Sequence, residues 1–185
     1  MSGGAIALVV IGVLVVLGFG VYLSSTAGRL DRLHKRIDSS DLSLDAHLLR
    51  RSSVALELAT SGWLDPATSI VLAQAAHGAR LSADDDPALR AAAESELTDA
   101  LAVALDADAL AEVMSAPGGR QVLEELDASC RRVELSRRFH NDAVQACRQL
   151  RDQGLVRVFR LAGHTPWPQT VELDDAIPEG LREAL

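Results

Sequence analysis

The sequence predicts an all-α protein: an N-terminal transmembrane helix, then an antiparallel four-helix bundle with long first and last helices, then a short irregular C-terminal tail. Three observations predict this class. Ala and Leu are abundant, and aromatic residues make up only 3% of the 185 residues, which favours helix over sheet. An uncharged apolar run stands near the N-terminus. The remaining chain places apolar residues at helical spacing between breaks made by Pro and Gly.

Residues 5–23, AIALVVIGVLVVLGFGVYL, contain no charged and no strongly polar side chain. As a helix they reach about 28 Å, which matches a hydrocarbon core of about 30 Å. We therefore expect an uncleaved anchor after a short N-terminus, residues 1–4. A cleaved signal peptide is the alternative, because Ser25-Thr26-Ala27 resembles a cleavage site. The length of the run and the lack of Lys or Arg before it favour the anchor.

The charges that flank this run predict its orientation. Residues 1–4 carry no basic side chain, whereas the run is followed by Arg29, Arg32, Lys35 and Arg36. The positive-inside rule then predicts a cell-membrane protein with its N-terminus outside and its C-terminal domain in the cytoplasm. The lipid bilayer is therefore an expected partner.

The two cysteines, Cys130 and Cys147, agree with a cytoplasmic domain. On one helix their 17-residue separation is about 25 Å, far beyond the roughly 7 Å between Cα atoms that a disulfide allows. Two free thiols fit a reducing compartment.

Four segments of helical periodicity make up the expected bundle, residues 29–154. Asp65-Pro66 and Asp86-Pro87 are typical of helix starts, because Asp accepts hydrogen bonds from free first-turn amides and Pro is tolerated at the first position. Gly62 and Gly154 are typical of helix ends, and Pro117-Gly118-Gly119 predicts a further break. The expected helices cover residues 29–60, 66–83, 87–105 with a last turn to 114, and 120–153, and Asp106 and Asp108 are expected to interrupt the third before that last turn.

The tail, residues 155–185, alternates apolar side chains with Arg157 and Arg160, and Pro166 and Pro168 exclude a continuous helix. Two placements are open. The tail caps the end of the bundle, or it lies at the membrane interface, where apolar, Arg and Trp side chains are favoured.

The formal net charge of −8 argues against nucleic acid as a partner. Residues 84–127 carry many carboxylates and only Arg90 and Arg120 as cations, and residues 131–160 carry an excess of arginine. These stretches either face one another across the bundle or form solvated surface.

Two helical motifs and the tail together resemble the LemA family of bacterial membrane proteins. The motifs are SLDAHLLRRSS, residues 43–53, and RRFHNDAV, residues 137–144. His140 stands where the family usually has Tyr, and Ser52-Ser53 where it has Tyr-Asp. The resemblance implies an N-terminal anchor, a long-helix antiparallel bundle and no enzymatic activity. The matching positions are Asp45, Leu48, Arg50, Arg51, Arg137, Arg138, Asn141 and Val144.

His140, Asn141 and Asp142 invite a catalytic interpretation, but successive helical side chains diverge by about 100°. We expect His140 to be a core or boundary residue, with any pH-dependent role left open, and the four-residue spacing allows Asp142 to pair with Arg138 on the surface. The other histidines lack metal-ligand spacing, and Asp84-Asp85-Asp86 is better explained as a helix cap than as a Ca²⁺ loop. The other histidines are His34, His47, His77 and His164. We therefore expect no catalytic residue, cofactor or metal.

Arg51 falls among the core positions of the first bundle helix, where a buried guanidinium needs a partner. Glu134 of the fourth helix and Glu94 or Glu96 of the third are the candidates.

The expected function is a membrane-anchored helical scaffold or protein-interaction module. The alternative is a regulatory or sensory accessory to a membrane protease or envelope-stress system. The protein partner is unknown, and association between copies of the chain is left open.

Overall fold

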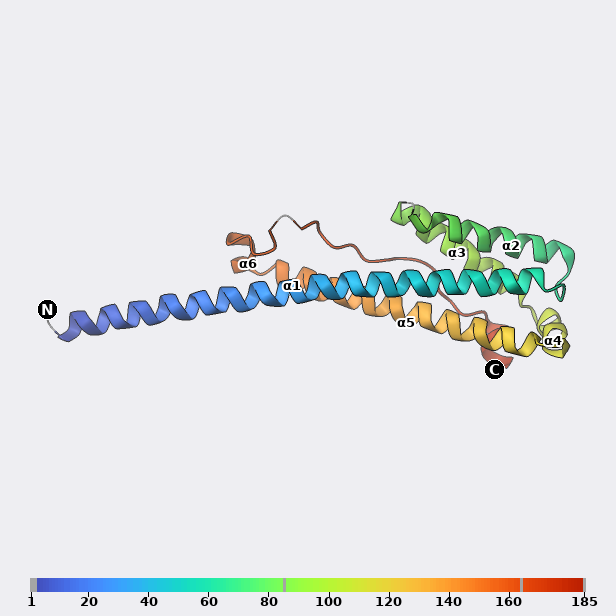
Figure 1. Ribbon diagram of the computed structural model, residues 1–185, viewed down its shortest axis with the longest axis horizontal. Helices are drawn as coiled ribbons and strands as arrows, with labels where there is room; N and C mark the ends of the chain where they lie inside the picture. Colours follow the sequence, from blue (N-terminus) through green and yellow to red (C-terminus); the bar gives the residue numbers. More distant parts are fainter. Residues whose placement is uncertain (1–2, 85, 164, 185) are drawn as a thin grey trace. The chain divides into compact units, whose positions relative to one another are not determined.

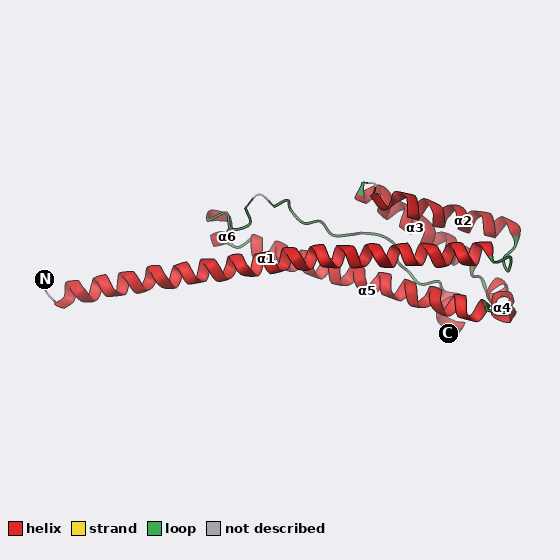
Figure 2. Cartoon of the chain, viewed as in Figure 1, coloured by secondary structure: helices red, strands yellow, loops and turns green. Residues whose placement is uncertain are grey.

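The computed structural model describes residues 3–84, 86–163 and 165–184, and within these ranges all regular structure is helical (Figures 1 and 2). The all-α class is confirmed. The elements are α1 (Gly3–Thr60), α2 (Pro66–Leu81), the short 3₁₀ turn η1 (Ser82–Asp84), α3 (Pro87–Ala104), α4 (Ala107–Ser115), α5 (Gly119–Arg151), α6 (Gly154–Val158) and α7 (Glu179–Ala184).

Helix α1 joins the apolar run and the first predicted bundle helix without a break. Its apolar part is long enough to cross a membrane, with a mean hydropathy of 2.4 and no buried residue over that window. The junction contains no Pro, and the hydroxyls of Ser25 and Thr26 both donate to the carbonyl of Tyr22 at 2.9 Å, so these polar residues stay within the helix. Of the predicted N-terminus, Met1 and Ser2 lie outside the described residues.

Aspartates begin three of the later helices. Asp65 accepts hydrogen bonds from the amides of Ala67 and Thr68 at 2.9 and 3.1 Å, and Asp86 accepts one from Ala88 at 2.9 Å. The pKa of Asp65 is lowered, first by its bonds with Thr68. Both caps agree with the sequence prediction. Asp85, which belongs to the predicted Asp84-Asp85-Asp86 cap, lies outside the described residues. Asp106, expected only to interrupt a helix, caps α4.

Two glycines with positive φ separate helices at predicted breaks. Gly62 has φ 78° just after α1, and Gly118 has φ 83° just before α5. Residues other than glycine rarely adopt this backbone conformation, so both glycines suit the turns they occupy.

The chain divides into two compact units. The first unit comprises residues 1–38 and 142–169, and the second comprises residues 39–141 and 170–185. Helices α1 and α5 each contribute residues to both.

The second unit contains the main hydrophobic core. It includes α2 and α3, which pack against each other, together with parts of α1 and α5. Helices α4 and α7 also contact each other and add to this core. Representative buried side chains, one from each of the six helices, are Leu58, Leu72, Leu97, Leu110, Leu126 and Leu181.

The first unit has a smaller core, formed by Leu30, Cys147, Leu150 and Val156. Val156 comes from α6, so the start of the tail packs against the end of α5 and the adjoining part of α1. The rest of the tail, from Thr170, belongs to the second unit. The tail therefore contributes residues to both units, and its predicted place at the bundle end or at a membrane interface stays a prediction.

Candidate functional site

A buried ion pair joins α1 to α3 in the second unit. Nη2 of Arg51 donates to Oε2 of Glu94 at 2.6 Å and to the Glu94 carbonyl at 3.0 Å. Nη1 of Arg51 donates to Oγ1 of Thr98 at 3.1 Å. The Arg51 and Glu94 side chains are only 1% and 2% exposed. Of the three candidate partners, the structure therefore selects Glu94.

The same part of α3 holds the extended tail. Oγ1 of Thr98 donates to the carbonyl of Asp174 at 2.7 Å, and the amide of Asp174 donates to Oγ of Ser95 at 2.9 Å. Thr98 therefore contacts both the buried Arg51 and the tail backbone, so the polar core and the tail share one hydrogen-bond network.

Helix α5 holds the tail from another side. Arg137 donates from Nε and Nη2 to both carboxylate oxygens of Asp175, at 2.6 and 2.9 Å. This hydrogen bond, more than the charge of Asp175, raises the pKa of Arg137. One turn further, Asn141 donates to the carbonyl of Val171 at 3.0 Å and accepts from its amide at 2.9 Å.

We call Ser95, Thr98, Arg137 and Asn141 the tail clamp. Arg137 and Asn141 belong to the motif RRFHNDAV, so two of the predicted motif residues position the tail. Their partners are 38 and 30 residues further along the chain, a separation that helical periodicity cannot reveal.

The other charged motif residues form ion pairs nearer the surface. Asp45 pairs with Arg90 at 2.6 Å, and Arg50 pairs with Glu125. Arg138 bonds Glu134, one turn before it, whereas helical spacing also allows Asp142, one turn after it. Exposed pairs of this kind contribute little to stability.

The two apolar motif residues are buried. Leu48 packs with Leu44 and Val133 and with Val171 and Leu173 of the tail. Val144 is fully buried in α5.

His140, Asn141 and Asp142 face different surroundings, as helical geometry predicts. His140 is buried, with Nδ1 3.3 Å from Oγ of Ser40 and 4.0 Å from a carboxylate oxygen of Asp41. Asn141 faces the tail, and the side chain of Asp142 is exposed. The three residues do not converge on a common point.

Both cysteines are buried and unpaired. Burial raises the pKa of the Cys130 thiol to about 11, and it also raises the pKa of Cys147. Among the described residues, no three His, Cys, Asp or Glu side chains are grouped closely enough to hold a metal ion. His164 lies outside them.

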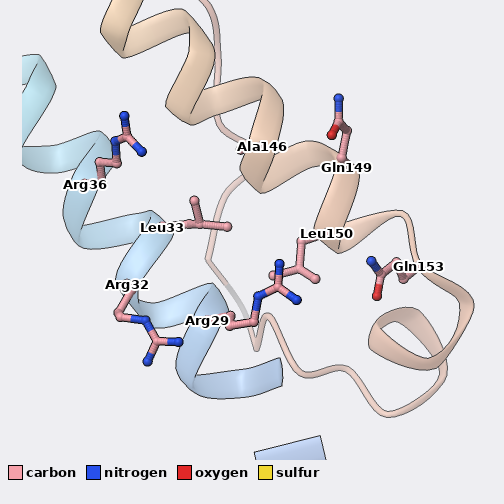
Figure 3. A pocket seen from close by; sticks show the side chains of 8 residues that line it. All are labelled: Arg29, Arg32, Leu33, Arg36, Ala146, Gln149, Leu150 and Gln153. Atoms are coloured by element: carbon pink, nitrogen blue, oxygen red, sulfur yellow. The ribbon is translucent and has the colours of Figure 1, made fainter. Parts of the chain in front are cut away.

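A separate, basic cavity lies in the first unit between α1 and the end of α5. Its volume is about 410 Å³. Figure 3 shows Arg29 and Leu33 extending from α1 toward Leu150 of α5. The lining residues are Arg29, Arg32, Leu33, Arg36, Ala146, Gln149, Leu150 and Gln153.

Aromatic side chains connect the tail to other parts of this unit. The ring of Phe159, just after α6, packs edge-to-face on Phe19 with centroids 5.4 Å apart. The guanidinium of Arg151 lies 4.9 Å from the centre of the Trp167 ring, and Arg151 also donates to the carbonyls of Thr165 and Pro166.

The sequence contained part of the signal for the cavity, because its three arginines recur at helical spacing. By sequence alone they predict only the orientation of the apolar run, since nothing in the sequence places Gln149 and Leu150 opposite them. Comparisons with models of protein families, with curated proteins and with solved structures found no match to this chain.

Proposed function

We propose that this protein is a membrane-anchored helical scaffold that acts by binding other proteins rather than by catalysis. The observation that carries the proposal is the continuity of α1, which is apolar and exposed from Leu8 to Tyr22 and then supplies buried residues such as Leu48 and Leu58 to the core of the second unit. One helix supplies both the membrane anchor and part of the folded domain. A protein that binds the domain is therefore held at the membrane.

Within this proposal, α1, α2, α3 and α5 form an antiparallel four-helix bundle, and the chain is a divergent member of the LemA family. The shared core of the second unit supports the bundle. The tail clamp supports the family assignment, because it provides a structural reason for an Arg and an Asn four residues apart in α5.

The outer face of α2 is the surface that best suits a protein partner. Ile70 and Leu81 are 60% and 69% exposed, and they are separated by Gln74 and His77 at helical spacing of four, three and four residues. Val71, 54% exposed, is a third large apolar side chain of α2 that faces solvent, and exposed apolar side chains gathered in a patch are typical of interaction surfaces.

A photo-crosslinking amino acid at Ile70 or Leu81, in native membranes, tests this function. Crosslinks between copies of the chain support the scaffold. One specific heterologous membrane protein at the same positions supports the regulatory accessory instead. Gln121, exposed on α5, is the matched control position. Equal crosslinking at Gln121 would contradict a docking role for α2.

The proposed orientation places the N-terminus outside and the folded domain in the cytoplasm, supported by the basic residues after the apolar run. Cys130 and Cys147 cannot report it, because both thiols are buried. A cysteine introduced at Glu57, exposed near the end of α1, is a suitable probe. We expect an impermeant maleimide to label it only after the membrane is opened. Labelling of intact cells would reverse the orientation.

A further inference from the structure

The three arginines of the cavity project from one face of α1. At about 100° per residue, the spacing of Arg29, Arg32 and Arg36 places them within about 60° of one another. All three side chains are exposed, and none forms an ion pair within the described part of the chain. The nearby acid Asp31 is bonded to Lys35 at 2.8 Å. The cavity therefore carries an excess of positive charge.

The rest of the lining suits a ligand that is anionic at one end and apolar at the other. Guanidinium groups bind phosphate oxygens by paired, charge-assisted hydrogen bonds. Gln149 and Gln153 add amides from the opposite wall, while Leu33 and Leu150 provide apolar surface. The volume of about 410 Å³ is within the range of small-molecule sites.

The cavity lies close along α1 to the membrane-spanning segment. Arg29 follows Leu23, the last residue of the apolar run, by six residues, or about 9 Å. The headgroup layer extends about 5 to 8 Å beyond the hydrocarbon on each side. Side chains on a helix lean toward its N-terminus, which for α1 is toward the bilayer. The guanidinium of Arg29 can therefore reach the level of lipid phosphates.

The beginning of the tail also lies beside the apolar run. Phe159 contacts Phe19, which is inside the apolar run. Around it, Leu155 and Val158 are exposed and Arg157 adds a positive charge. This composition is typical of segments at a membrane interface.

We infer that this cavity binds the headgroup of an anionic phospholipid from the bilayer that α1 crosses. The arginines bind the phosphate oxygens, the glutamines bind the polar linker, and Leu33 and Leu150 contact the first apolar part of the lipid. Three cations favour two phosphates over one, so diphosphatidylglycerol should bind more tightly than phosphatidylglycerol. The inference rests on the membrane insertion of α1 in the proposed function.

The test is lipid retention by the full-length chain, released from nanodiscs that contain phosphatidylcholine with diphosphatidylglycerol and measured by native mass spectrometry. We expect wild type to retain diphosphatidylglycerol in preference to phosphatidylcholine. Arg29→Gln should weaken retention about fivefold, and Arg29→Gln with Arg32→Gln should weaken it further. Arg157→Gln is the matched control, because it removes the same charge near the membrane from a residue outside the cavity lining.

A neutral variant separates the cavity from general charge attraction. Ala146→Phe fills part of the cavity and leaves every charge in place, so it should also reduce retention. If Ala146→Phe does not fold, as judged by its thermal melting, Gln149→Ala removes a lining amide from an exposed position and should reduce retention more weakly.

Three results would overturn the inference. Equal losses in Arg157→Gln and Arg29→Gln would mean diffuse surface attraction. Displacement of the lipid by inorganic phosphate would mean a site for soluble anions. Wild type without lipid preference would mean no site.

Alkaline extraction of the membranes separates these results from failure of the proposed function. A chain that is extracted has no inserted α1, whereas an inserted chain without lipid preference contradicts the headgroup site alone.

Discussion

Arg51 of α1 and Glu94 of α3 form an ion pair at 2.6 Å that is almost completely closed to solvent. Removing charges from water is costly, and this cost is offset only when both partners are present and hydrogen-bonded. Thr98 and the Glu94 carbonyl supply additional bonds to Arg51. The pair therefore makes the association of α1 with α3 sensitive to single substitutions.

Glu94→Leu and Arg51→Leu should each lower the free energy of unfolding by about 3–5 kcal/mol, because each leaves one buried charge without a partner. The double variant should lose less than either single variant. Denaturant unfolding of the full chain in detergent measures all three. Glu134→Gln, which removes the surface partner of Arg138, is the control and should cost at most about 1 kcal/mol. Single variants as stable as wild type would disprove the pairing.

Asn141→Ala should release the tail from α5. It removes both hydrogen bonds to the backbone of Val171, and losing partners for partly buried groups costs about 1–3 kcal/mol. Hydrogen exchange should become faster at the amides of Val171 and Asp174. Gln121→Ala, an exposed amide on the same helix, should leave both amides unchanged. Unchanged exchange in Asn141→Ala would mean that the tail is held without α5.

Gly180→Ala should weaken the docking of α7. A Cβ at this position would lie 2.7 Å from the carbonyl oxygen of Leu105, a backbone atom that cannot move aside cheaply. We expect a lower melting temperature and faster hydrogen exchange at Leu181. Gly78→Ala is the control, because nothing lies within 4 Å of its added Cβ in α2, and it should stabilise the protein by about 0.5–1 kcal/mol. Equal effects at both glycines would contradict the close contact.

Cys130 should react slowly with alkylating reagents in the folded protein at pH 8. The thiolate is the reactive form, and burial raises the pKa of this thiol to about 11. Because the pKa is raised in the folded state, the protonated thiol makes its full contribution to the free energy of unfolding below the unfolded pKa, about 8.5. This contribution is lost as the pH rises toward 11. In Cys130→Ala this part of the alkaline decline should disappear. Rapid labelling of native protein would contradict the burial.

The cap of α2 should make the protein sensitive to acid. The pKa of Asp65 is lowered by its hydrogen bonds, so its contribution is present above the pKa of an unfolded aspartate and is lost as pH falls through the lower, folded value. Asp65→Asn keeps a capping side chain that does not titrate. We expect its melting temperature to fall less than that of wild type between pH 5 and 3. Parallel declines would show that other carboxylates dominate.

Local chemistry made the helices predictable. The apolar run, the aspartate caps at Asp65 and Asp86, and the breaks at Gly62 and Gly118 each depend on residues adjacent in the chain, and the structure has helices or breaks at all of them. The continuity of α1 was missed. The sequence predicts an apolar helix that ends at Leu23 and a bundle helix that begins at Arg29, with Ser25-Thr26-Ala27 as a possible cleavage site, whereas the hydroxyls of Ser25 and Thr26 bond within one helix.

By itself, the sequence determined an all-helical protein with one apolar N-terminal helix and a buried arginine in need of a partner. Only the tertiary structure decided which carboxylate that partner is, because Glu94, Glu96 and Glu134 all lie on helices that could face Arg51. It also decided the course of the tail, since an extended segment has no helical periodicity and its hydrogen bonds reach Ser95, Thr98, Arg137 and Asn141 from far along the chain. Periodicity reports local geometry, whereas such partners depend on the packing of whole helices.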